Sequence, residues 1–253
     1  MSTVFHRHPA APWVELRESH SAPHCFRLHM HAEYSIGIVD AGVTEFRHAG
    51  GPEPVRAGDV VLIEPGLWHA CNPVPGARWS YRMLFVQADW VHAQLGVRAL
   101  RFPARVLGGC AADAADRLCQ PGRLPASAED LLNLLRRHGE PASPLPGDSA
   151  VDAALRTLHA RPESAPSVQA LAEAAGMGAA QFIRRFKAAT GVTPGVYRLN
   201  LRLNGARRLL AQGTPLADAA HAMGFADQAH MQRSFKAHHA LTPGRYAFGG
   251  LNP

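Results

Sequence analysis

The chain has 253 residues, of which 47% are hydrophobic and 18% are charged, and this balance excludes a disordered or low-complexity protein. Its net charge of +6 is unevenly distributed. The first 145 residues carry 14 basic and 14 acidic side chains, whereas the remaining 108 carry 12 basic and 6 acidic ones. This asymmetry predicts a neutral module followed by a basic module that binds a polyanion.

Secreted, membrane and disulfide-rich proteins are also excluded. Residues 1–12 contain no apolar segment of the kind found in a secretory signal, and no apolar run approaches the roughly 18 residues that cross a bilayer. The four cysteines form no C-x-x-C pair and are too few for a disulfide scaffold. We therefore expect a cytoplasmic protein with reduced thiols and no membrane partner.

Short apolar or alternating segments, separated by glycine and proline, predict β-strands between residues 24 and 86. The expected strands are residues 34–39, 43–47, 60–63 and 79–86, and the β unit is expected to end near Val86. This pattern is typical of an all-β barrel or sandwich. Apolar residues at helical spacing then predict two helices, at about 111–118 and 128–137. The leucines of the second helix would either form a dimer interface or pack on the chain's own barrel.

Histidines form a pattern in this β region. His29 and His31 are two residues apart, so both side chains would point to one face of a strand, and His69 and Cys71 repeat this arrangement. With their surroundings they resemble the two sequence motifs of the cupin barrels. The resemblance rests on His29, His31, Glu33, Tyr34, Gly42, Gly58, Asp59, Pro65, Gly66, His69 and Asn72. It implies that two histidines and a glutamate of the first motif, with a histidine of the second, can hold one metal ion.

The glutamate of that motif is displaced in this chain. Cupins carry it further from the second histidine, where Ser35 and Ile36 stand here, and Glu33 is the nearest acidic residue. By alternation Glu33 would share the face of the histidines, so the candidate metal ligands are His29, His31, Glu33 and His69. Three neutral nitrogens without a firm fourth ligand make a weak site. We therefore expect no cofactor, and an effector pocket lined by His29, His31, Tyr34, Trp68 and His69.

The C-terminal part contains an internal repeat. Residues 168–176 recur at 216–224 with a shift of 48, and residues 184–197 recur at 233–246 with a shift of 49. Each copy predicts a short helix that ends at a glycine, followed by a second helix at 179–189 or 227–238. Asp227 is the expected cap of the latter helix. Two helices joined by a tight turn are typical of a helix-turn-helix, whose second helix enters the major groove of DNA.

The second helix of each copy has an apolar and a polar side. Phe182, Phe186, Met231 and Phe235 mark the expected buried side. The polar side carries arginine and glutamine, which form bidentate bonds to guanine and adenine. Its members are Gln181, Arg184, Arg185, Gln228, His230, Gln232 and Arg233.

A long helix is predicted between the copies, at residues 194–211. Thr193 is its expected N-cap, and an apolar stripe is formed by Val196, Leu199, Leu203, Ala206 and Leu210. Its 18 residues span roughly 27 Å, close to the ~34 Å between successive major grooves on one face of DNA. Basic residues along it are expected to contact phosphates, namely Arg198, Arg202, Arg207 and Arg208.

Residues 150–248 resemble the AraC/XylS family of bacterial transcriptional regulators. The resemblance rests on the segment from Gly224 to Lys236 and on Thr242, Pro243 and Tyr246, while Gly178 and Ala240 replace the family's usual serine and glycine. By position it assigns DNA contact to Ala180, Gln181, Ile183 and Arg184 in the first copy and to Gln228, Ala229, His230, Gln232 and Arg233 in the second. A cupin-like sensor in front of the DNA-binding domain is the family's common arrangement.

The resemblance implies a two-domain fold. A cupin-like all-β barrel with flanking helices, for effector binding and dimerisation, would occupy residues 1–140 and a linker residues 141–149. An all-α domain of two helix-turn-helix units joined by a helix would occupy residues 150–253. We expect a dimeric regulator, an activator that contacts RNA polymerase, which binds double-stranded DNA and responds to a small-molecule effector. The alternatives are a metal-dependent cupin enzyme or a metal-sensing regulator that uses His29, His31 and His69.

Overall fold

The computed structural model describes residues 2–22, 26–74, 77–142 and 148–248, which form two compact units. The first unit comprises residues 1–143 and 248–253, and the second comprises residues 144–247. The predicted linker, residues 141–149, lies partly outside the described residues, because 143–147 are not among them. The two units are described separately below.

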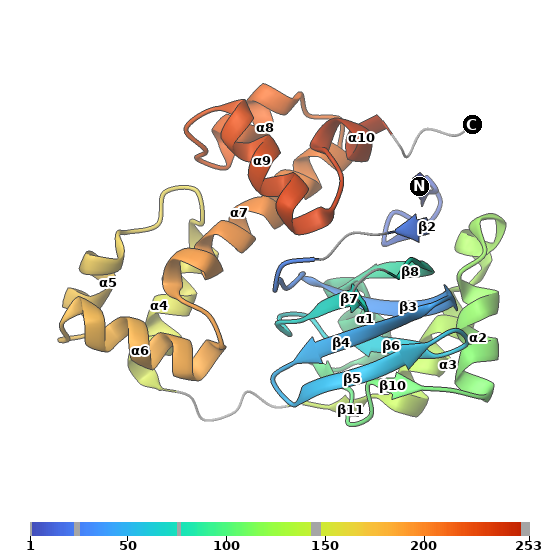
Figure 1. Cartoon of the computed structure of the whole chain (residues 1–253). Coiled ribbons are helices and arrows are strands. Elements are labelled where there is room, and N and C mark those ends of the chain that lie inside the picture. Colours follow the sequence, from blue (N-terminus) through green and yellow to red (C-terminus); the bar gives the residue numbers. More distant parts are fainter. Residues whose placement is uncertain (1, 23–25, 75–76, 143–147, 249–253) are drawn as a thin grey trace. The chain divides into compact units, whose positions relative to one another are not determined.

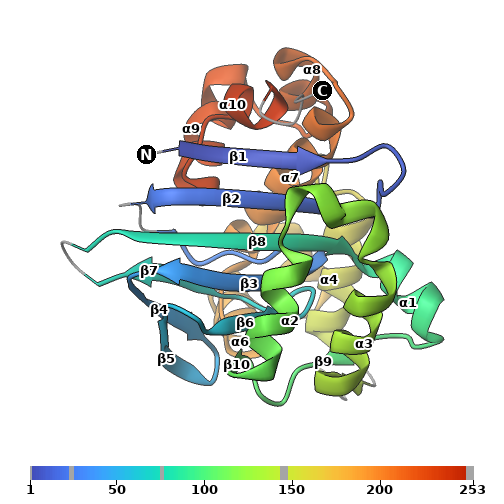
Figure 2. The ribbon, with the colours of Figure 1, turned by 90° about the vertical axis from the view of Figure 1, so that its right-hand side faces the viewer.

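The N-terminal unit contains a six-stranded antiparallel sheet (Figures 1 and 2). Its strands lie in the order β1 (Ser2–Arg7), β2 (Val14–Ala22), β8 (Trp79–Gln87), β3 (Glu33–Ala41), β6 (Val60–Ile63) and β10 (Val106–Leu107). A three-stranded sheet has the order β5 (Gly51–Arg56), β4 (Val43–His48) and β7 (Ala70–Pro73). A further short pair joins β9 (Leu100–Arg101) to β11 (Glu140–Pro141).

Helices cover one face of the six-stranded sheet. Figure 2 shows α2 (Cys110–Leu118) and α3 (Ala128–His138) lying across it, and η1 (Pro121–Ala126) joins them. The helix α1 (Ala88–Leu95) directly follows β8. The core beneath these helices is formed by side chains such as Ile36, Leu84, Leu118, Leu131 and Leu135. The leucines of α3 therefore pack on the chain's own sheet, and their burial leaves them unavailable to a dimer interface.

The opposite face of the sheet turns toward the three-stranded sheet. A second core lies on this side and includes Val39, Val61, Phe46, Val55 and Tyr81. Side chains alternate along a strand, so the odd-numbered residues of β8 and β3 belong to this inner face and the even-numbered ones to the helix-covered face. This alternation determines which residues can reach a site between the sheets.

The predicted strands and helices of this unit are confirmed, but they are not the complete set. The hairpin β1–β2, the strands β5 and β7 and the helix α1 were not predicted, and the β structure does not end at Val86, because β10 pairs with β6. In β2, Val14 and Leu16 face the helix-side core, whereas Arg17 and Ser19 are buried on the other side. A strand whose inner face is polar lacks the apolar signal on which sequence-based prediction relies.

The C-terminal unit is helical. Its helices are α4 (Ser149–Ala160), α5 (Val168–Ala174), α6 (Ala179–Thr190), α7 (Pro194–Ala211), α8 (Leu216–Ala222), α9 (Gln228–His239) and α10 (Pro243–Phe248). Figure 1 shows α7 running between the group of α4 to α6 and the group of α8 to α10. The pairs α5–α6 and α8–α9 are the two copies of the repeat.

Local signals in the sequence explain where these helices begin and end. The backbone is left-handed at Gly176 (φ 67°) and Gly224 (φ 66°), as expected for the glycines that follow α5 and α8. The side chain of Asp227 accepts a hydrogen bond of 2.6 Å from the backbone N–H of His230, which caps α9 as predicted.

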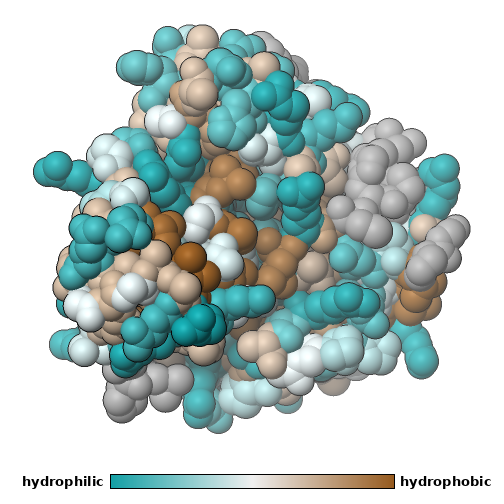
Figure 3. All heavy atoms as spheres, turned by 60° about the vertical axis from the view of Figure 1, so that its left-hand side comes forward, coloured by the Kyte–Doolittle hydropathy of each residue, from teal (hydrophilic) through white to brown (hydrophobic). Residues whose placement is uncertain are grey.

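The face drawn in Figure 3 carries many hydrophilic residues around a more apolar centre, and the mean hydropathy of the chain is −0.12. Among the described residues, we find no helix with both the length and the apolar character needed to span a bilayer.

Candidate functional site

The second helix of each repeat copy has one buried and one exposed side, as predicted. Phe182 and Phe186 in α6, and Met231 and Phe235 in α9, are fully buried. The side chains of Gln181, Arg184, Gln228 and Arg233 are exposed. Arg184 and Arg233 stand at matching positions of the repeat, and neither makes a hydrogen bond or ion pair with the described residues.

The remaining predicted DNA-contacting residues differ in exposure. Ala180 and Ala229 are exposed, whereas Ile183, His230 and Gln232 are half-buried. The imidazole of His230 packs edge-on against Phe225, with 5.4 Å between ring centroids. Arg185 is half-exposed, and its Nε lies 2.5 Å from the Asp148 carboxylate. Arg185 is therefore partly neutralised within its own unit, unlike Arg184.

Three of the four arginines of α7 have structural partners, which makes the prediction that all four contact phosphates wrong. The guanidinium of Arg198 donates to the carbonyls of Pro162 and Glu163, both at 3.1 Å. That of Arg202 donates to the carbonyl of Met223 and lies 4.2 Å from the centroid of the Phe225 ring. Arg207 is only 7% exposed, so Arg208 alone has an exposed side chain.

The predicted apolar stripe of α7 is also wrong at its first position. Val196 is 40% exposed, whereas Tyr197 and Asn200 are buried in its place. Tyr197 donates or accepts a hydrogen bond of 2.9 Å with Nε2 of His159 in α4, and its ring meets that of Phe186 edge-on at 5.6 Å. The aromatic ring therefore anchors the first repeat copy to α7.

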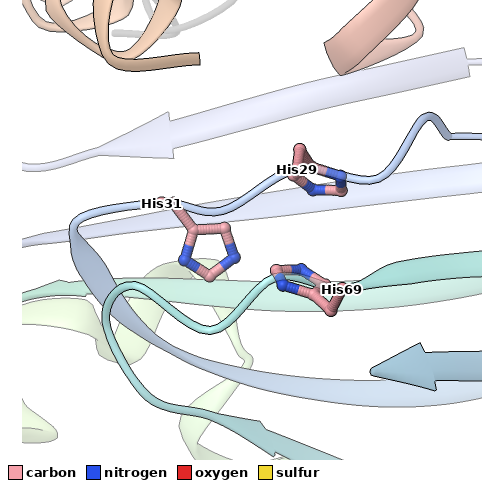
Figure 4. Close-up of side chains that lie close together, drawn as sticks. All are labelled: His29, His31 and His69. Carbon is pink, nitrogen blue, oxygen red and sulfur yellow. The ribbon is translucent and has the colours of Figure 1, made fainter. Parts of the chain in front are cut away.

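In the N-terminal unit, the three predicted histidines come together between the sheets. His29 and His31 lie in the segment before β3, and His69 lies just before β7 (Figure 4). The backbones of His29 and His69 exchange two hydrogen bonds, N–H to carbonyl, of 3.0 and 2.8 Å. One ring nitrogen from each of the three side chains lies within 4.8 Å of the others.

The three imidazoles are oriented in the same way. Each Nδ1 lies within hydrogen-bonding distance of a backbone carbonyl: that of Arg27 for His29 at 2.8 Å, Glu33 for His31 at 3.0 Å and Leu67 for His69 at 2.9 Å. If each Nδ1 donates its proton there, each Nε2 keeps a lone pair. Burial, together with the neighbouring His31, lowers the pKa of His69 to about 3, so this ring is neutral at pH 7.

This arrangement fits a divalent transition metal with open coordination positions. Histidine ligands of a metal commonly donate their other N–H to a carbonyl, as all three do here. Bound metals lie 2.0–2.1 Å from a histidine nitrogen, so the rings would have to close slightly around an ion. Among the described residues, the carboxylate of Glu33 does not join the cluster of the other three candidate ligands. Glu33 instead contributes its carbonyl to His31.

Tyr34 does not belong to the predicted effector pocket. It is fully buried in the core beneath the helices, its hydroxyl lies 2.9 Å from Nε2 of His92 and accepts a hydrogen bond of 2.8 Å from the N–H of Leu100. Alternation along β3 places its neighbour Ser35 beside His31 instead, with 3.3 Å between the hydroxyl and the ring. The other predicted pocket residue, Trp68, is buried at 8% exposure.

Two protein families match the chain, and their matches overlap at residues 171–180. The family described as an AraC-like ligand binding domain matches residues 12–180, and the family described as a helix-turn-helix domain matches residues 171–247. The uncharacterized HTH-type transcriptional regulator YbfI of Bacillus subtilis is 27% identical over 226 residues, which cover 81% of each chain. The probable transcriptional regulator LumQ of Photobacterium leiognathi is 35% identical over 83 residues, which cover 32% of this chain and 34% of LumQ.

A solved structure has the same fold. The structure of ToxT from Vibrio cholerae, with an unsaturated fatty acid bound, gives a TM-score of 0.62 at 12% identity and covers 93% of this chain and 94% of ToxT. The ligand-binding family spans more than half of the chain, and the helix-turn-helix family spans the repeat. The chain therefore belongs to the AraC family of transcriptional regulators, which combine a ligand-binding domain with a helix-turn-helix DNA-binding domain.

Proposed function

We propose that this regulator reads two successive major grooves through the exposed sides of α6 and α9. The observation that carries the proposal is the matched exposure of Arg184 and Arg233, which occupy equivalent places in the two repeat copies. Each helix also carries an exposed glutamine, Gln181 in α6 and Gln228 in α9, although the two do not stand at equivalent places of the repeat. Arginine pairs with guanine and glutamine with adenine in the major groove. Ala180, Ile183, Ala229, His230 and Gln232 would add apolar and polar contacts to base edges.

The test is DNA binding by single variants. Arg184→Ala and Arg233→Ala should each weaken binding to the specific site by about 1–3 kcal/mol and weaken binding to random DNA far less. Fluorescence anisotropy with the DNA upstream of the regulator's own gene would measure both. Arg156→Ala, which removes an exposed arginine from α4, is the matched control and should bind as the wild type does. Equal losses on both DNAs would exclude base reading.

We propose that Arg185 also contacts DNA, but contributes less than Arg184. Its ion pair with Asp148 must open before its guanidinium can bind a phosphate or a base. Exposed ion pairs contribute about 0–1 kcal/mol, so this opening has a small free-energy cost. Asp148→Asn should therefore leave specific binding unchanged or slightly stronger, which a titration at constant salt would detect.

We propose further that the inner face of the N-terminal sheet binds a small-molecule effector and that the regulator acts in the cytoplasm as a homodimer. A groove of about 370 Å³ between α2 and α3 carries charges of both signs, including Arg117, Arg137 and Asp130, which a two-fold contact could pair. Sedimentation of the full chain tests dimerisation. In vitro transcription by RNA polymerase from the regulator's own promoter, with and without the regulator, distinguishes an activator from a repressor.

A metal-sensing regulator is the second candidate, and the shared orientation of the three histidines favours it. His29, His31 and His69 would hold the ion, and an effector oxygen or water would complete its coordination. Metal analysis of the purified protein tests this idea: His31→Ala should lose any bound zinc, manganese or iron. We propose no catalytic role, because the cluster offers no carboxylate as a general base among the described residues.

A further inference from the structure

Arg17 is a buried arginine for which the described residues provide no acidic partner. It lies on the inner face of β2 and is 7% exposed. Its Nε donates a hydrogen bond of 3.1 Å to the hydroxyl of Ser19. The carboxylates nearest to it in sequence have other partners: Glu15 lies 2.6 Å from Arg7, and Glu18 lies 2.8 Å from His6.

Aromatic rings surround the guanidinium. Its central carbon lies 5.7 Å from the ring centroid of Phe5, 5.4 Å from that of Phe26 and 5.5 Å from that of Tyr81. Ring faces attract a cation, but they do not supply the oxygen acceptors that the two terminal amino groups of arginine require. A buried cation without an anion is strongly unfavourable. The side chain is therefore prepared for an anion that the described residues do not contain.

The inner face beside Arg17 is less completely buried than the helix-covered face. On the helix side of β8, Leu84 and Val86 are 1% and 0% exposed. On the inner side, Tyr81 is 4% exposed, but Met83 and Phe85 are only half-buried. Solvent therefore reaches the inner face at Met83, which pairs with Arg17 between β2 and β8, and at Phe85.

Phe26 connects this region to the histidine cluster. Its ring neighbours Arg17 and also lies 5.9 Å from the ring of His29. The backbone N–H of Phe26 donates to the Asn72 side chain at 2.5 Å, and the Asn72 amide donates back to the Phe26 carbonyl at 3.2 Å. This pair of hydrogen bonds to Asn72 in β7 fixes the backbone from which the Phe26 ring projects. Arg17 and the histidines therefore belong to one face.

We propose that the effector is a carboxylate, whose anion pairs with the Arg17 guanidinium and whose apolar body lies against Phe26 and Phe85. The proposal rests on effector binding by the inner face, as proposed above. Ser19, fully buried next to Arg17, supplies a hydroxyl at the same place. Burial raises the pKa of Tyr81, so its phenol, which shares a hydrogen bond with the Ser19 side chain, stays protonated beside the guanidinium. Paired, charge-assisted hydrogen bonds of this kind are among the strongest in proteins.

Benzoate and benzamide test the proposal on the full chain, because the two probes share a shape and differ in charge. All four tryptophans lie in the N-terminal unit, and Trp79 stacks on Tyr81 with ring centroids 4.2 Å apart. Tryptophan fluorescence therefore reports unfolding of this unit. We expect benzoate to raise the thermal midpoint saturably and benzamide to leave it unchanged. Equal stabilisation by both probes, or none by benzoate, would overturn the assignment of an anion site.

Variants of Arg17 test whether stabilisation by benzoate depends on the Arg17 side chain. Arg17→Met, which removes the charge, should raise the benzoate concentration for half-maximal stabilisation by roughly tenfold or more. Arg17→Lys keeps the charge but loses the bidentate fork, so it should fall between the two. Arg98→Met removes an exposed arginine of the same unit and should behave as the wild type does. If Arg17→Met does not fold, the comparison of the two probes on the wild type remains decisive.

The outcome is independent of the proposed DNA reading. Binding of the wild type to its own upstream DNA is measured separately by anisotropy, and Arg17 belongs to the unit that does not carry the repeat. Loss of the benzoate effect with intact DNA binding would overturn the carboxylate assignment alone. Failure of DNA binding in the presence of the benzoate effect would overturn the DNA proposal alone.

Discussion

Ala240 has a left-handed backbone at the end of α9, with φ 58°, where the first repeat copy has Gly191 with φ 83°. Its N–H bonds to the carbonyl of Lys236 and closes the helix, so the conformation is required by the turn. A side chain with a Cβ is strained in this region by about 1–2 kcal/mol. The strain is confined to the second copy, because the first copy has glycine at the equivalent position.

We therefore expect Ala240→Gly to stabilise the C-terminal unit by roughly 1 kcal/mol. Gly191→Ala is the mirror experiment and should destabilise by a similar amount. Urea denaturation followed by helical circular dichroism would measure both. If both substitutions shift the midpoint in the same direction, backbone strain is not the cause.

Because of Tyr197, the free energy of unfolding of the C-terminal unit falls as the pH rises above 10. Burial raises the pKa of its hydroxyl to about 12, above the value of about 10 for an unfolded tyrosine. Below pH 10 both states are protonated and the full stability is present. Between pH 10 and 12 only the unfolded state loses its proton, so stability falls across this window, by up to about 2–3 kcal/mol. Tyr197→Phe should reduce this slope, measured by denaturation at several pH values.

At the scale of elements, Gly205 leaves room on α7 for a side chain of the second repeat copy. A Cβ at this buried position would lie 2.2 Å from Sδ of Met223, directly after α8. The Met223 side chain therefore fills the space that a larger residue at position 205 would need. Arg202 reinforces the same contact through the carbonyl of Met223 and the ring of Phe225.

This packing reverses the usual effect of a helical substitution. Glycine to alanine inside a helix normally stabilises by about 1 kcal/mol, but Gly205→Ala should destabilise by roughly 1–3 kcal/mol through overpacking. Met223→Ala removes the clashing sulfur, so Gly205→Ala should be far less harmful in its presence. A double-mutant cycle of urea midpoints measures this coupling, and simple additivity would contradict it.

The elements of the C-terminal unit could be predicted more fully than their contacts. Proline at the start of α7, aspartate at the cap of α9 and glycines after α5 and α8 are local signals. The repeat doubles the proline and the glycines, whereas Gly178 stands at the cap of α6. The arginines of α7 could not be assigned from sequence. Their acceptors are backbone carbonyls, such as those of Pro162 and Met223, which every residue type supplies and no pattern reveals.

In the N-terminal unit, the histidines could be grouped by motif. Tyr34 is expected in the pocket because it follows that motif, but the alternation that puts Ser35 beside His31 places its ring on the other face, in the core beneath the helices. Arg17 carries no comparable signal. A polar inner face gives β2 no apolar alternation on that side, so neither the strand nor its buried cation was predicted.

At the scale of the whole molecule, the charge asymmetry has a measurable consequence. Twelve basic residues follow residue 145, but Arg198, Arg202 and Arg207 are held inside the unit. The affinity for DNA should therefore fall with salt less steeply than the sequence count suggests. The N-terminal unit, with equal numbers of basic and acidic residues, should add little to this dependence.

Arg208→Ala should lower the slope of log K against log salt by about 1 and weaken specific and random DNA alike. Arg202→Ala should instead lower the stability of the C-terminal unit and leave the slope unchanged, because its guanidinium binds a carbonyl and an aromatic ring. Anisotropy titrations at several salt concentrations separate the two. An unchanged slope for Arg208→Ala would remove this residue from the phosphate contacts.

The packing of both repeat copies on α7 makes that helix a stiff spacer. Tyr197 anchors the first copy, and Gly205 with Arg202 anchors the second, so the separation and the relative rotation of the two copies are set together. One base pair added between the two half-sites turns one of them by about 35° around the DNA axis. A flexible tether would follow this rotation, whereas α7 would not. For the reading of two successive grooves proposed above, we therefore expect single-base insertions between the half-sites to abolish binding even when both half-sites keep their sequence.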